Sequence, residues 1–516
     1  MARVAIGLWL LCGTVSCSGS TASNPDGNAG AGTGSGGNEV SSSTGGSGSS
    51  GSSTSAGGAH AAAGSGGSAG KASAGGAGGS AGSSVLTDAG SGGASAGAGG
   101  SEVLTGDLGV TPAKGSVWDL PSGDPLNSTQ PVLARLGDGI VLAGATADPK
   151  LAGLDAFDSG VESEAFLARL DHAGKIKWSH PLLPAGLPNA VAVTAAQEIV
   201  VVAPYLPDLV TVSPYFSSDS IYLGKFSDSG TPAFEKELAF DTGTRVYALA
   251  VDGTGAIWLA GAQSNKDDFP NESMMLAKYD DKGVEQFVHT YSHDGSTCYV
   301  NSISANAAGD VVFTGTFNGN FNLGGEKLTT QATLDSFLMP NGFVARFDSA
   351  GKHVWSQRFG GPIFDLGNAV TWLPDGSIAL AGLLSGAASV GGKTVAAEPE
   401  EGQSFVAHLS GTGKASWAEL ATGAARAIAV EPDGSALHVA GSFDDSAYLQ
   451  DRDAATGMLL RSAKAAAGTP DAYSAALDSA GSLWLAGNYT TSADFSNENL
   501  LSAASGVFLL RLDRAP

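Results

Sequence analysis

Two histidines and a cysteine lie close together in the sequence and form its best candidate for a metal site. They are His289, His293 and Cys298. Imidazole and thiolate are ligands that zinc accepts, but zinc sites usually show sharper spacing and a fourth ligand nearby. The simpler interpretation is a pair of surface histidines beside a buried thiol, since an unpaired cysteine is commonly buried. We therefore assign no metal ligand in this segment.

Other short sequence motifs also have a structural explanation that requires no catalytic, cofactor-binding or metal-binding role. The turn 280–283, Asp-Asp-Lys-Gly, lacks the spaced acids and the terminal Glu of a calcium loop. The Asn-rich segment 318–322 and the segment 494–497 could bind sugars or ions, but each is more simply a solvated loop. The glycine runs 32–37 and 66–70 fit a dinucleotide fingerprint and a hydrolase nucleophile elbow, yet neither lies between a strand and a helix. Asp and Ser are abundant without distinctive spacing, so we assign no catalytic residue and no cofactor.

The elements that would position a site belong to a repeated unit. An apolar run of five residues that ends in glycine recurs at intervals of roughly 46 to 67 residues, which indicates a repeat fold. Its copies are 140–144, 257–261, 311–315, 378–382, 437–441 and 483–487, and 200–204 is a copy that ends in proline. We interpret the glycine as a breaker that ends the run.

Each unit contains four runs with period-two alternation, separated by turns rich in Asp and Gly such as 348–351 and 373–376. This pattern predicts antiparallel strands and hairpins, and no segment after residue 113 has helical spacing. The first strand is rich in Ala and Ser, whereas the fourth carries an aromatic residue four positions after its turn glycine. These aromatics are Trp178, Phe234, Phe287, Trp355 and Trp417. Arg461 takes that place in the sixth unit, where we expect looser packing.

A gradient from small to bulky side chains fits blades that converge on an axis and diverge at a rim. The first three strands of the unit each occur seven times, but the chain stops after the last third strand, at 508–513. We expect the segment 114–120, with Trp118, to supply the missing fourth strand and so remove a free strand edge. Residues 113–516 are therefore predicted to form an all-β, seven-bladed β-propeller of four-stranded antiparallel blades.

The units resemble the β-propeller repeats of bacterial cell-surface and secreted proteins. The motifs that carry the resemblance are Asp-Gly-x5-Gly at 375–382, Phe-Val-Ala-Arg-Phe-Asp at 343–348 and Gly-Lys-x-x-Trp at 351–355. The resemblance covers nearly everything after residue 113. It implies fold and location, and it transfers no catalytic residues, because that family shares none.

The first 112 residues differ from the rest of the chain in composition and lack its repeated strand pattern. Residues 1–16 combine Arg3 with an apolar run, which predicts an export signal that is too short to remain as a membrane anchor. Thr-Val-Ser-Cys at 14–17 resembles a bacterial lipobox, although Thr14 stands where Leu is usual. This resemblance implies a lipid anchor on Cys17 and an outer-membrane lipoprotein that faces the periplasm or the cell surface. An ordinary secretory cleavage is the alternative. Residues 17–112 are almost wholly Gly, Ser and Ala, which predicts a disordered tether.

The net charge of −24 disfavours nucleic acid as a partner. Three functions fit the sequence. The first is a membrane-anchored extracytoplasmic binding or scaffold module, the second is a polysaccharide- or peptide-directed enzyme, and the third is a structural spacer in the envelope. The sequence does not assign an enzyme class.

Connection lengths predict where a ligand would bind. Turns between the first and second strands and between the third and fourth strands are short, and they define a short-turn face. The other connections are longer and more variable, and we call their side of the ring the long-loop face. Examples are 145–164, 263–272, 316–341 and 383–403. We expect a protein or glycan ligand on the long-loop face, near Asp268, Asn320 and Glu398, because loops tolerate variation on a rigid scaffold. Shortening the longer connections of the fourth and fifth blades is expected to abolish binding without unfolding the domain.

Overall fold

The computed structural model describes about two thirds of the chain. The described residues are 117–121, 130–146, 164–182, 185–205, 218–264, 272–292, 294, 298–330, 333–334, 337–361, 363–398, 402–443, 446–465, 467–495, 500–501 and 506–513. They form strands and connecting turns. No helix among them is long and apolar enough to cross a membrane. The predicted signal 1–16 and tether 17–112, which includes Cys17, lie outside the described residues, as do Asp268 and His293.

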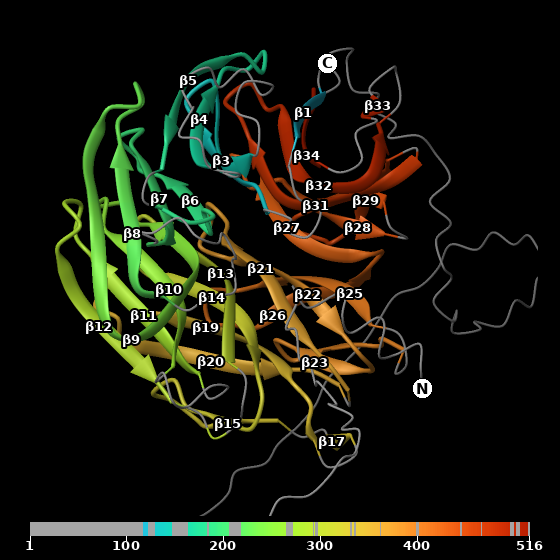
Figure 1. Cartoon of the computed structure of the whole chain (residues 1–516). Helices are drawn as coiled ribbons and strands as arrows, with labels where there is room; N and C mark the ends of the chain where they lie inside the picture. The colour runs from blue at the N-terminus through green and yellow to red at the C-terminus, as the bar shows by residue number, and fades with distance from the viewer. Residues whose placement is uncertain are drawn as a thin grey trace, which may run out of the picture. The chain divides into compact units, whose positions relative to one another are not determined.

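Antiparallel blades of four strand segments follow one another around an axis, as Figure 1 shows, and blades 2 and 3 are joined into one seven-stranded sheet by the long strand β9. Blade 1 contains β2 (Val132–Leu136), β3 (Gly139–Thr146), β4 (Glu164–Leu170) and β5 (Ile176–Pro181). Blade 2 contains β6 (Ala190–Val193), β7 (Ile199–Pro204), β8 (Ser218–Phe226) and the first half of β9 (Pro232–Val251). The second half of β9 begins blade 3, which continues with β10 (Ile257–Ser264), β11 (Ser273–Tyr279) and β12 (Glu285–Tyr291).

The remaining blades repeat this order. Blade 4 contains β13 (Cys298–Ala305), β14 (Val311–Phe317), β19 (Asn341–Phe347) and β20 (His353–Phe359). Blade 5 contains β21 (Leu366–Trp372), β22 (Ile378–Leu384), β25 (Gln403–Leu409) and β26 (Ala415–Ala421). Blade 6 contains β27 (Ala424–Val430), β28 (Ala436–Phe443), β29 (Ser446–Asp453) and β30 (Leu459–Lys464). Blade 7 contains β31 (Ala467–Leu477), β32 (Leu483–Asp494), β34 (Gly506–Leu512) and β1 (Val117–Pro121), with β33 (Leu500–Leu501) paired to β32.

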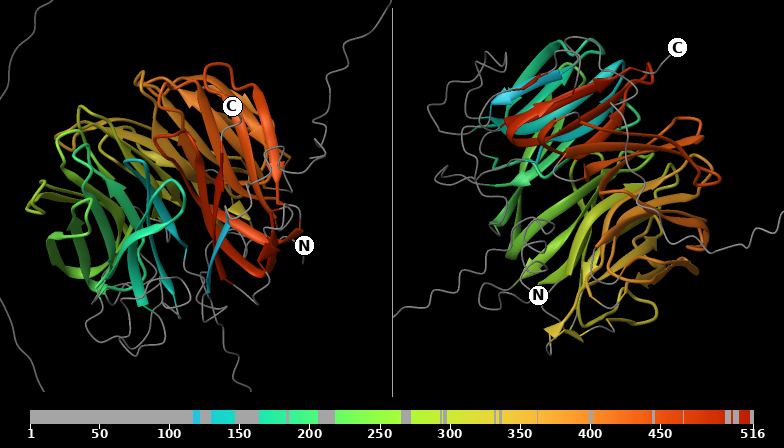
Figure 2. Two further views of the ribbon diagram at one scale, coloured as in Figure 1. Left: turned by 90° about the horizontal axis from the view of Figure 1, so that it is seen from above. Right: turned by 90° about the vertical axis from the view of Figure 1, so that its right-hand side faces the viewer.

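Blade 7 combines strands from the two ends of the described chain. Strand β1 pairs antiparallel with β34, and Figure 1 and Figure 2 show it beside the C-terminal strands. The predicted all-β, seven-bladed propeller is thus confirmed. The sequence also suggests that Trp118 matches the aromatics of the other fourth strands, and this match is wrong. In blade 1 the fourth-strand Trp178 pairs with Arg169, but Trp118 pairs with Leu509, two residues away from the corresponding Arg511. Trp118 is therefore not the positional counterpart of the other fourth-strand aromatics.

Neighbouring blades are joined at the rim by an aromatic ring packed on a glycine. The fourth-strand aromatic of one blade covers the glycine in the turn between the third and fourth strands of the next. The pairs are Trp178–Gly230, Phe234–Gly283, Phe287–Gly351, Trp355–Gly413 and Trp417–Gly457. All five glycines have φ between 68° and 82°, a region that other residues rarely adopt. Glycine is thus required there both by its backbone conformation and by the ring above it.

Polar contacts reinforce the same junctions. Three indole N–H groups donate to main-chain oxygens of the next blade's turn: Trp178 to Asp228 at 2.7 Å, Trp355 to Gly411 at 2.9 Å and Trp417 to Ala454 at 2.9 Å. Basic third-strand residues reach the same turns. Arg169 pairs with the Asp228 carboxylate at 2.8 Å, and Lys225, Lys278, Arg346 and Arg511 donate to the carbonyl oxygens of Asp281, Ser349, Gly411 and His172. Each of the five rim junctions from blade 1 to blade 6 therefore has both an apolar and a hydrogen-bonded contact.

Blade 6 departs from this pattern because blade 7 has no turn between its third and fourth strands, which come from opposite ends of the chain. Asp451 occupies the place of the basic residue, and Arg461 the place of the aromatic; they form an ion pair, with Nε 2.7 Å from Oδ2. His438 bonds to Asp451 at 2.8 Å. Met458 and Leu460 beside them are 61% and 53% exposed, but Val284 and Val354, at the same places in blades 3 and 4, are also exposed, so these exposures do not distinguish the packing of blade 6.

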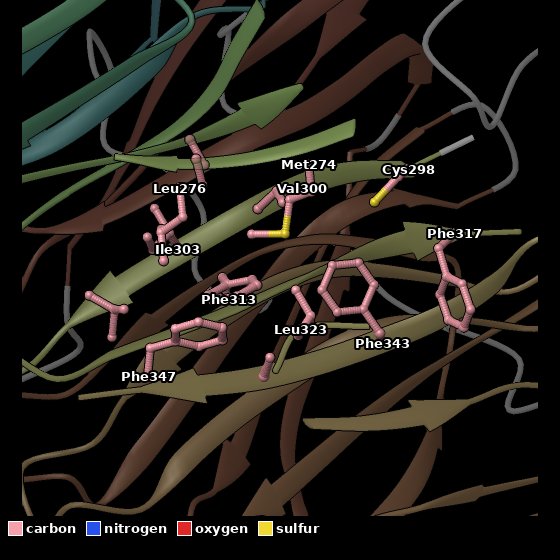
Figure 3. Packing of buried hydrophobic residues seen from close by; sticks show 14 of the residues in the cluster. Met274, Leu276, Cys298, Val300, Ile303, Phe313, Phe317, Leu323, Phe343 and Phe347 are labelled. Atoms are coloured by element: carbon pink, nitrogen blue, oxygen red, sulfur yellow. The ribbon is translucent and has the colours of Figure 1, made fainter. Parts of the chain in front are cut away.

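Small side chains near the axis allow innermost strands of different blades to bond directly. The Oγ atoms of Ser302 and Ser304 accept from the N–H groups of Val370 (3.1 Å) and Trp372 (3.2 Å). Ser474 accepts in the same way from Leu133. Bulkier hydrocarbon fills the space farther out. Figure 3 shows the core of blades 3 and 4, where Phe313, Phe317, Phe343 and Phe347 pack with Met274 and Leu276.

The longer connections of blades 4 and 5 fold against the outer strands. They contain the hairpins β15 (Asn320–Phe321) with β16 (Leu328–Thr329), β17 (Thr333–Leu334) with β18 (Phe337–Leu338), and β23 (Ala388–Val390) with β24 (Lys393–Val395). Strand β16 contacts β20, and β24 contacts β26; Figure 1 shows β15 at the periphery. Phe321, Leu328, Val390 and Val395 are buried in the core. Shortening these connections would therefore lower stability, contrary to the expectation from sequence.

The rim contact can be tested with two glycines that share one backbone conformation. Gly230 and Gly376 both have φ +82°, but a Cβ at Gly230 would lie 2.7 Å from Cδ2 of Trp178, whereas a Cβ at Gly376 meets nothing within 4 Å. Gly230→Ala is expected to lower the free energy of unfolding by about 1–3 kcal/mol more than Gly376→Ala, because only the first overpacks a ring. Urea denaturation measures both. Equal losses would show that the ring contact does not constrain the turn.

Candidate functional site

The innermost strands of blades 3 to 7 each contain a β-bulge at the same position. In every case one residue has no partner on the second strand, and the register shifts by one. The bulged residues are Tyr247, Asn301, Asn368, Arg426 and Tyr473. Bulges redirect side chains and are over-represented next to functional sites. The repetition of the bulge in five blades makes these residues the first candidates for a site.

The glycine of the five-residue repeat is explained by these bulges. A Cβ on Gly261, Gly315 or Gly441 would overlap a main-chain carbonyl oxygen of the bulged strand. The bulge brings the two backbones so close that only glycine fits. In blade 1, which has no bulge, the nearest atoms to a Cβ on Gly144 belong to Phe166, 3.5 Å away. The prediction that the glycine ends the strand is wrong, since β10 and β14 continue three and two residues beyond it.

The bulged residues lie toward the beginning of each first strand, where the fourth-to-first connection enters, and hence toward the long-loop face. Asn189 stands at the same offset in blade 2, five residues before the turn residue Thr194. We call Asn189 and the five bulged residues the axial ring. Asn301 is exposed and the others are half-buried, although they belong to the innermost strands, where neighbouring side chains are small. The axial ring is therefore accessible from the axis.

Three asparagines of the axial ring are held by the next blade. The Nδ2 groups of Asn189, Asn301 and Asn368 donate to the carbonyl oxygens of Val246, Gly367 and Ala425, at 2.5, 2.8 and 2.8 Å. Each amide is thereby oriented, and its Oδ1 remains as an acceptor. No group among the described residues donates to these three oxygens. The ring therefore presents fixed carbonyl-type acceptors from three blades.

The charged groups of the site are paired. In blade 3, Arg245 Nη1 lies 2.6 Å from Oε1 of Glu272, whose pKa is raised by burial against the opposing effect of the guanidinium. Between blades 6 and 7, Arg426 Nη2 lies 3.1 Å from Oδ2 of Asp471. The Arg426 guanidinium also lies over the ring of Tyr473, 4.9 Å from its centroid. The site thus combines hydrogen-bonding groups and aromatic rings without an unbalanced charge.

Sequence reasoning missed the axial ring. The sequence predicts that only small side chains, Ala and Ser, lie near the axis. Tyr247, Tyr473 and Arg426 are exceptions to that prediction. The signal that could have found them is their constant offset, five residues before the first residue of each first turn. The offset indicates a set of related positions only once the structure shows that a bulge occurs there.

The residues of the metal hypothesis have different environments. His289 is exposed on β12 and stacks on Phe287, with centroids 4.4 Å apart. Cys298 is fully buried in the core shown in Figure 3, and burial raises the pKa of its thiol well above the ordinary value. His293 lies outside the described residues. In the part of the chain that the structure describes, no three His, Cys, Asp or Glu side chains form a group that could hold a metal ion.

The candidate loop residues make hydrogen bonds to other parts of the propeller or to their own turns. The Asp280 carboxylate accepts the N–H groups of Val284 (2.8 Å) and Lys282 (2.9 Å), which lowers its pKa. Asn320 donates twice to the Asp294 carboxylate at 2.5 Å. The first arrangement stabilises a turn, and the second joins the connection before β13 to the connection after β14. At Glu398 the main-chain N–H donates to the side chain of Gln403 at 2.8 Å.

One serine–histidine pair resembles part of a catalytic triad. Ser416 Oγ lies 2.6 Å from Nδ1 of His408, whose pKa is lowered by burial. The nearby Asp375 carboxylate accepts from the N–H and hydroxyl of Ser377, with no hydrogen bond to His408 among the described contacts. A triad needs the acid to orient the histidine. This pair therefore lacks the third group that would make it a nucleophile and base.

Comparisons with known proteins add little to this geometry. No protein-family model matches the sequence, and no curated protein is similar to it. A solved structure described as the Dos1 propeller is 11% identical, with 78% of this chain and 95% of that chain covered and a TM-score of 0.41. A streptogramin B lyase structure is 12% identical, with 77% and 97% covered and the same TM-score. At these values neither likeness bears on function, and the fold rests on the strand pairing described above.

The link between bulge and glycine predicts different outcomes for one substitution in two blades. Gly315→Ala would place a methyl group on the Tyr299 carbonyl oxygen, so it is expected to cost at least about 3 kcal/mol or to prevent folding. Gly144→Ala meets only Phe166 and is expected to stay within about 1 kcal/mol of the wild type. Denaturation curves of both variants decide the matter. A tolerated Gly315→Ala would contradict the proposed reason for the glycine.

Proposed function

We propose that the protein is a membrane-anchored, extracytoplasmic binding module whose ligand occupies the axial ring on the long-loop face. The observation that carries this proposal is the recurrence of polar and aromatic side chains at one offset in six blades. They stand on innermost strands, where packing alone favours small residues. Positions at which local rules are broken in a repeated fold are the expected places for function.

The proposed anchor is the lipidated Cys17 at the end of the signal 1–16, in an outer-membrane lipoprotein. The Gly/Ser/Ala composition of residues 17–112 supports a tether between anchor and propeller. A flexible chain of that length has a root-mean-square reach of roughly 50–60 Å. Such a tether would hold the ring clear of the membrane without orienting it, as a binding module for an envelope polymer requires.

The described groups support binding better than catalysis. A polysaccharide-directed hydrolase would need two carboxyl groups that can act as acid and as base or nucleophile. Both carboxylates of this site, Glu272 and Asp471, are instead paired with arginines. A purely structural spacer would not need tyrosines and oriented amides at the axis. The enzyme and spacer alternatives therefore receive less support from these residues.

Removing ring side chains is expected to weaken binding without unfolding the ring. Asn368→Ala combined with Tyr473→Ala should lower retention of the purified chain on immobilised envelope polysaccharide or envelope protein fractions by at least tenfold. Each lost hydrogen bond or ring contact accounts for about 0.5–1.5 kcal/mol. The control is Lys414→Ala with Thr412→Ala on the short-turn face. Loss of retention in the control but not in the ring variant would refute the proposed location.

The anchor can be tested independently of binding. Cys17→Ala removes the only atom that could accept the lipid at the predicted lipobox, so the protein should move from the membrane fraction to the soluble fraction. Cys12→Ala, within the predicted signal, is the matched control and should remain in the membrane fraction. Membrane association that survives Cys17→Ala would show that the chain is held by other means.

A further inference from the structure

We infer that the axial ring recognises a neutral, hydroxyl-rich ligand, such as the end of an uncharged saccharide, and that Arg426, Tyr448, Asp471 and Asn488 between blades 6 and 7 anchor it. This inference rests on the proposed binding function and names the chemistry of its ligand. It is carried by the polar atoms of these four side chains.

Polar atoms without partners are concentrated at this part of the ring. The Tyr448 hydroxyl, Arg426 Nε, Asp471 Oδ1 and both amide atoms of Asn488 are buried and have no hydrogen-bond partner among the described residues. Tyr448 is 1% exposed and Asn488 is 8% exposed. Buried polar groups are nearly always hydrogen-bonded, so several unsatisfied ones in one place need an explanation. A ligand with several hydroxyl groups would supply the missing partners.

These side chains come from two blades and meet near the axis. Asp471 is directly opposite Asn488 in the register of β31 and β32, so both side chains leave the same face of the sheet. Arg426 reaches Asp471 from blade 6 and covers the ring of Tyr473. The pKa of the Tyr448 hydroxyl is raised mainly by burial, and the charges of Arg452, Arg426 and Asp471 also act on this hydroxyl. The four groups therefore form one cluster at the blade 6–7 junction.

The donor and acceptor character of these buried atoms indicates the class of ligand. Asp471 Oδ1 and Asn488 Oδ1 accept, Arg426 Nε and Asn488 Nδ2 donate, and the Tyr448 hydroxyl does both. A sugar hydroxyl also donates and accepts, and neighbouring hydroxyls match the two atoms of a planar amide or carboxylate. The Arg426–Asp471 pair carries no net charge, so it offers no net attraction that would offset the cost of desolvating an anionic or a cationic ligand. A neutral ligand carries no such cost. The three free Oδ1 atoms of Asn189, Asn301 and Asn368 offer further acceptors around the axis.

The test is calorimetric titration of the full chain at fixed ionic strength with matched oligosaccharides. The probes are a neutral glucose trimer, a uronic-acid trimer, a glucosamine trimer and Ca²⁺ alone. The neutral trimer is expected to bind at least tenfold more tightly than either charged trimer. Asn488→Asp keeps the shape but adds charge and removes a donor, so it should weaken the neutral trimer at least tenfold. Arg426→Met should have a similar effect. Asn322→Asp, on the exposed β15–β16 hairpin at the rim, should change nothing, and melting temperatures verify folding.

The outcomes separate this inference from the proposed function. Preferential binding of a charged trimer or Ca²⁺, lost in Asn368→Ala, would overturn the ligand class while the axial binding function stands. Failure of every probe to bind would also overturn the ligand class. If, in addition, the Asn368→Ala/Tyr473→Ala variant retained envelope polymers as well as the wild type does, the proposed binding function would be refuted too. Unchanged affinity for the neutral trimer in folded Asn488→Asp and Arg426→Met would overturn the assignment of the anchoring residues.

Discussion

The structure depends on the contact between the fourth-strand aromatic of one blade and the turn glycine of the next. The contact needs a flat ring on one side and, on the other, a backbone with positive φ and no Cβ, as at Trp178 and Gly230. It fixes the spacing of consecutive blades at the rim, where bulk must fill the diverging gap. Because the last blade is assembled from both chain ends, it has no such turn. At the corresponding places of blade 6, Arg461 and Asp451 form an ion pair within the blade.

A second constraint acts near the axis, where space is smallest. There a bulge in the first strand and a glycine in the second strand depend on each other, as at Asn301 and Gly315. The bulge turns one side chain out of the regular alternation. The glycine leaves room for the main-chain carbonyl group that the bulge brings close to the second strand. Fold and site are thus coupled, since the residue that defines the repeat most clearly also permits the ring of polar side chains.

The junction of blades 6 and 7 differs from the others at both ends. At the rim, blade 6 has an ion pair in place of an aromatic. Near the axis, Arg426, Asp471, Tyr448 and Asn488 carry buried polar atoms that have no hydrogen-bond partner among the described residues. The longer connections have another role, because those of blades 4 and 5 cover outer strands that would otherwise present free edges. Variation in connection length thus reflects protection of edges.

The sequence by itself determined the strands, the number of blades and the closure by residues from both ends, because period-two alternation, turn glycines and counting are local properties. It also identified the rim aromatics. It did not identify the axial ring, since a bulge is a relation between two strands and leaves no composition of its own. Only the tertiary structure decided that Tyr247 and Tyr473 stand among small neighbours and that Asp471 and Asn488 share a face. Those relations join segments that are distant along the chain, and no single segment encodes them.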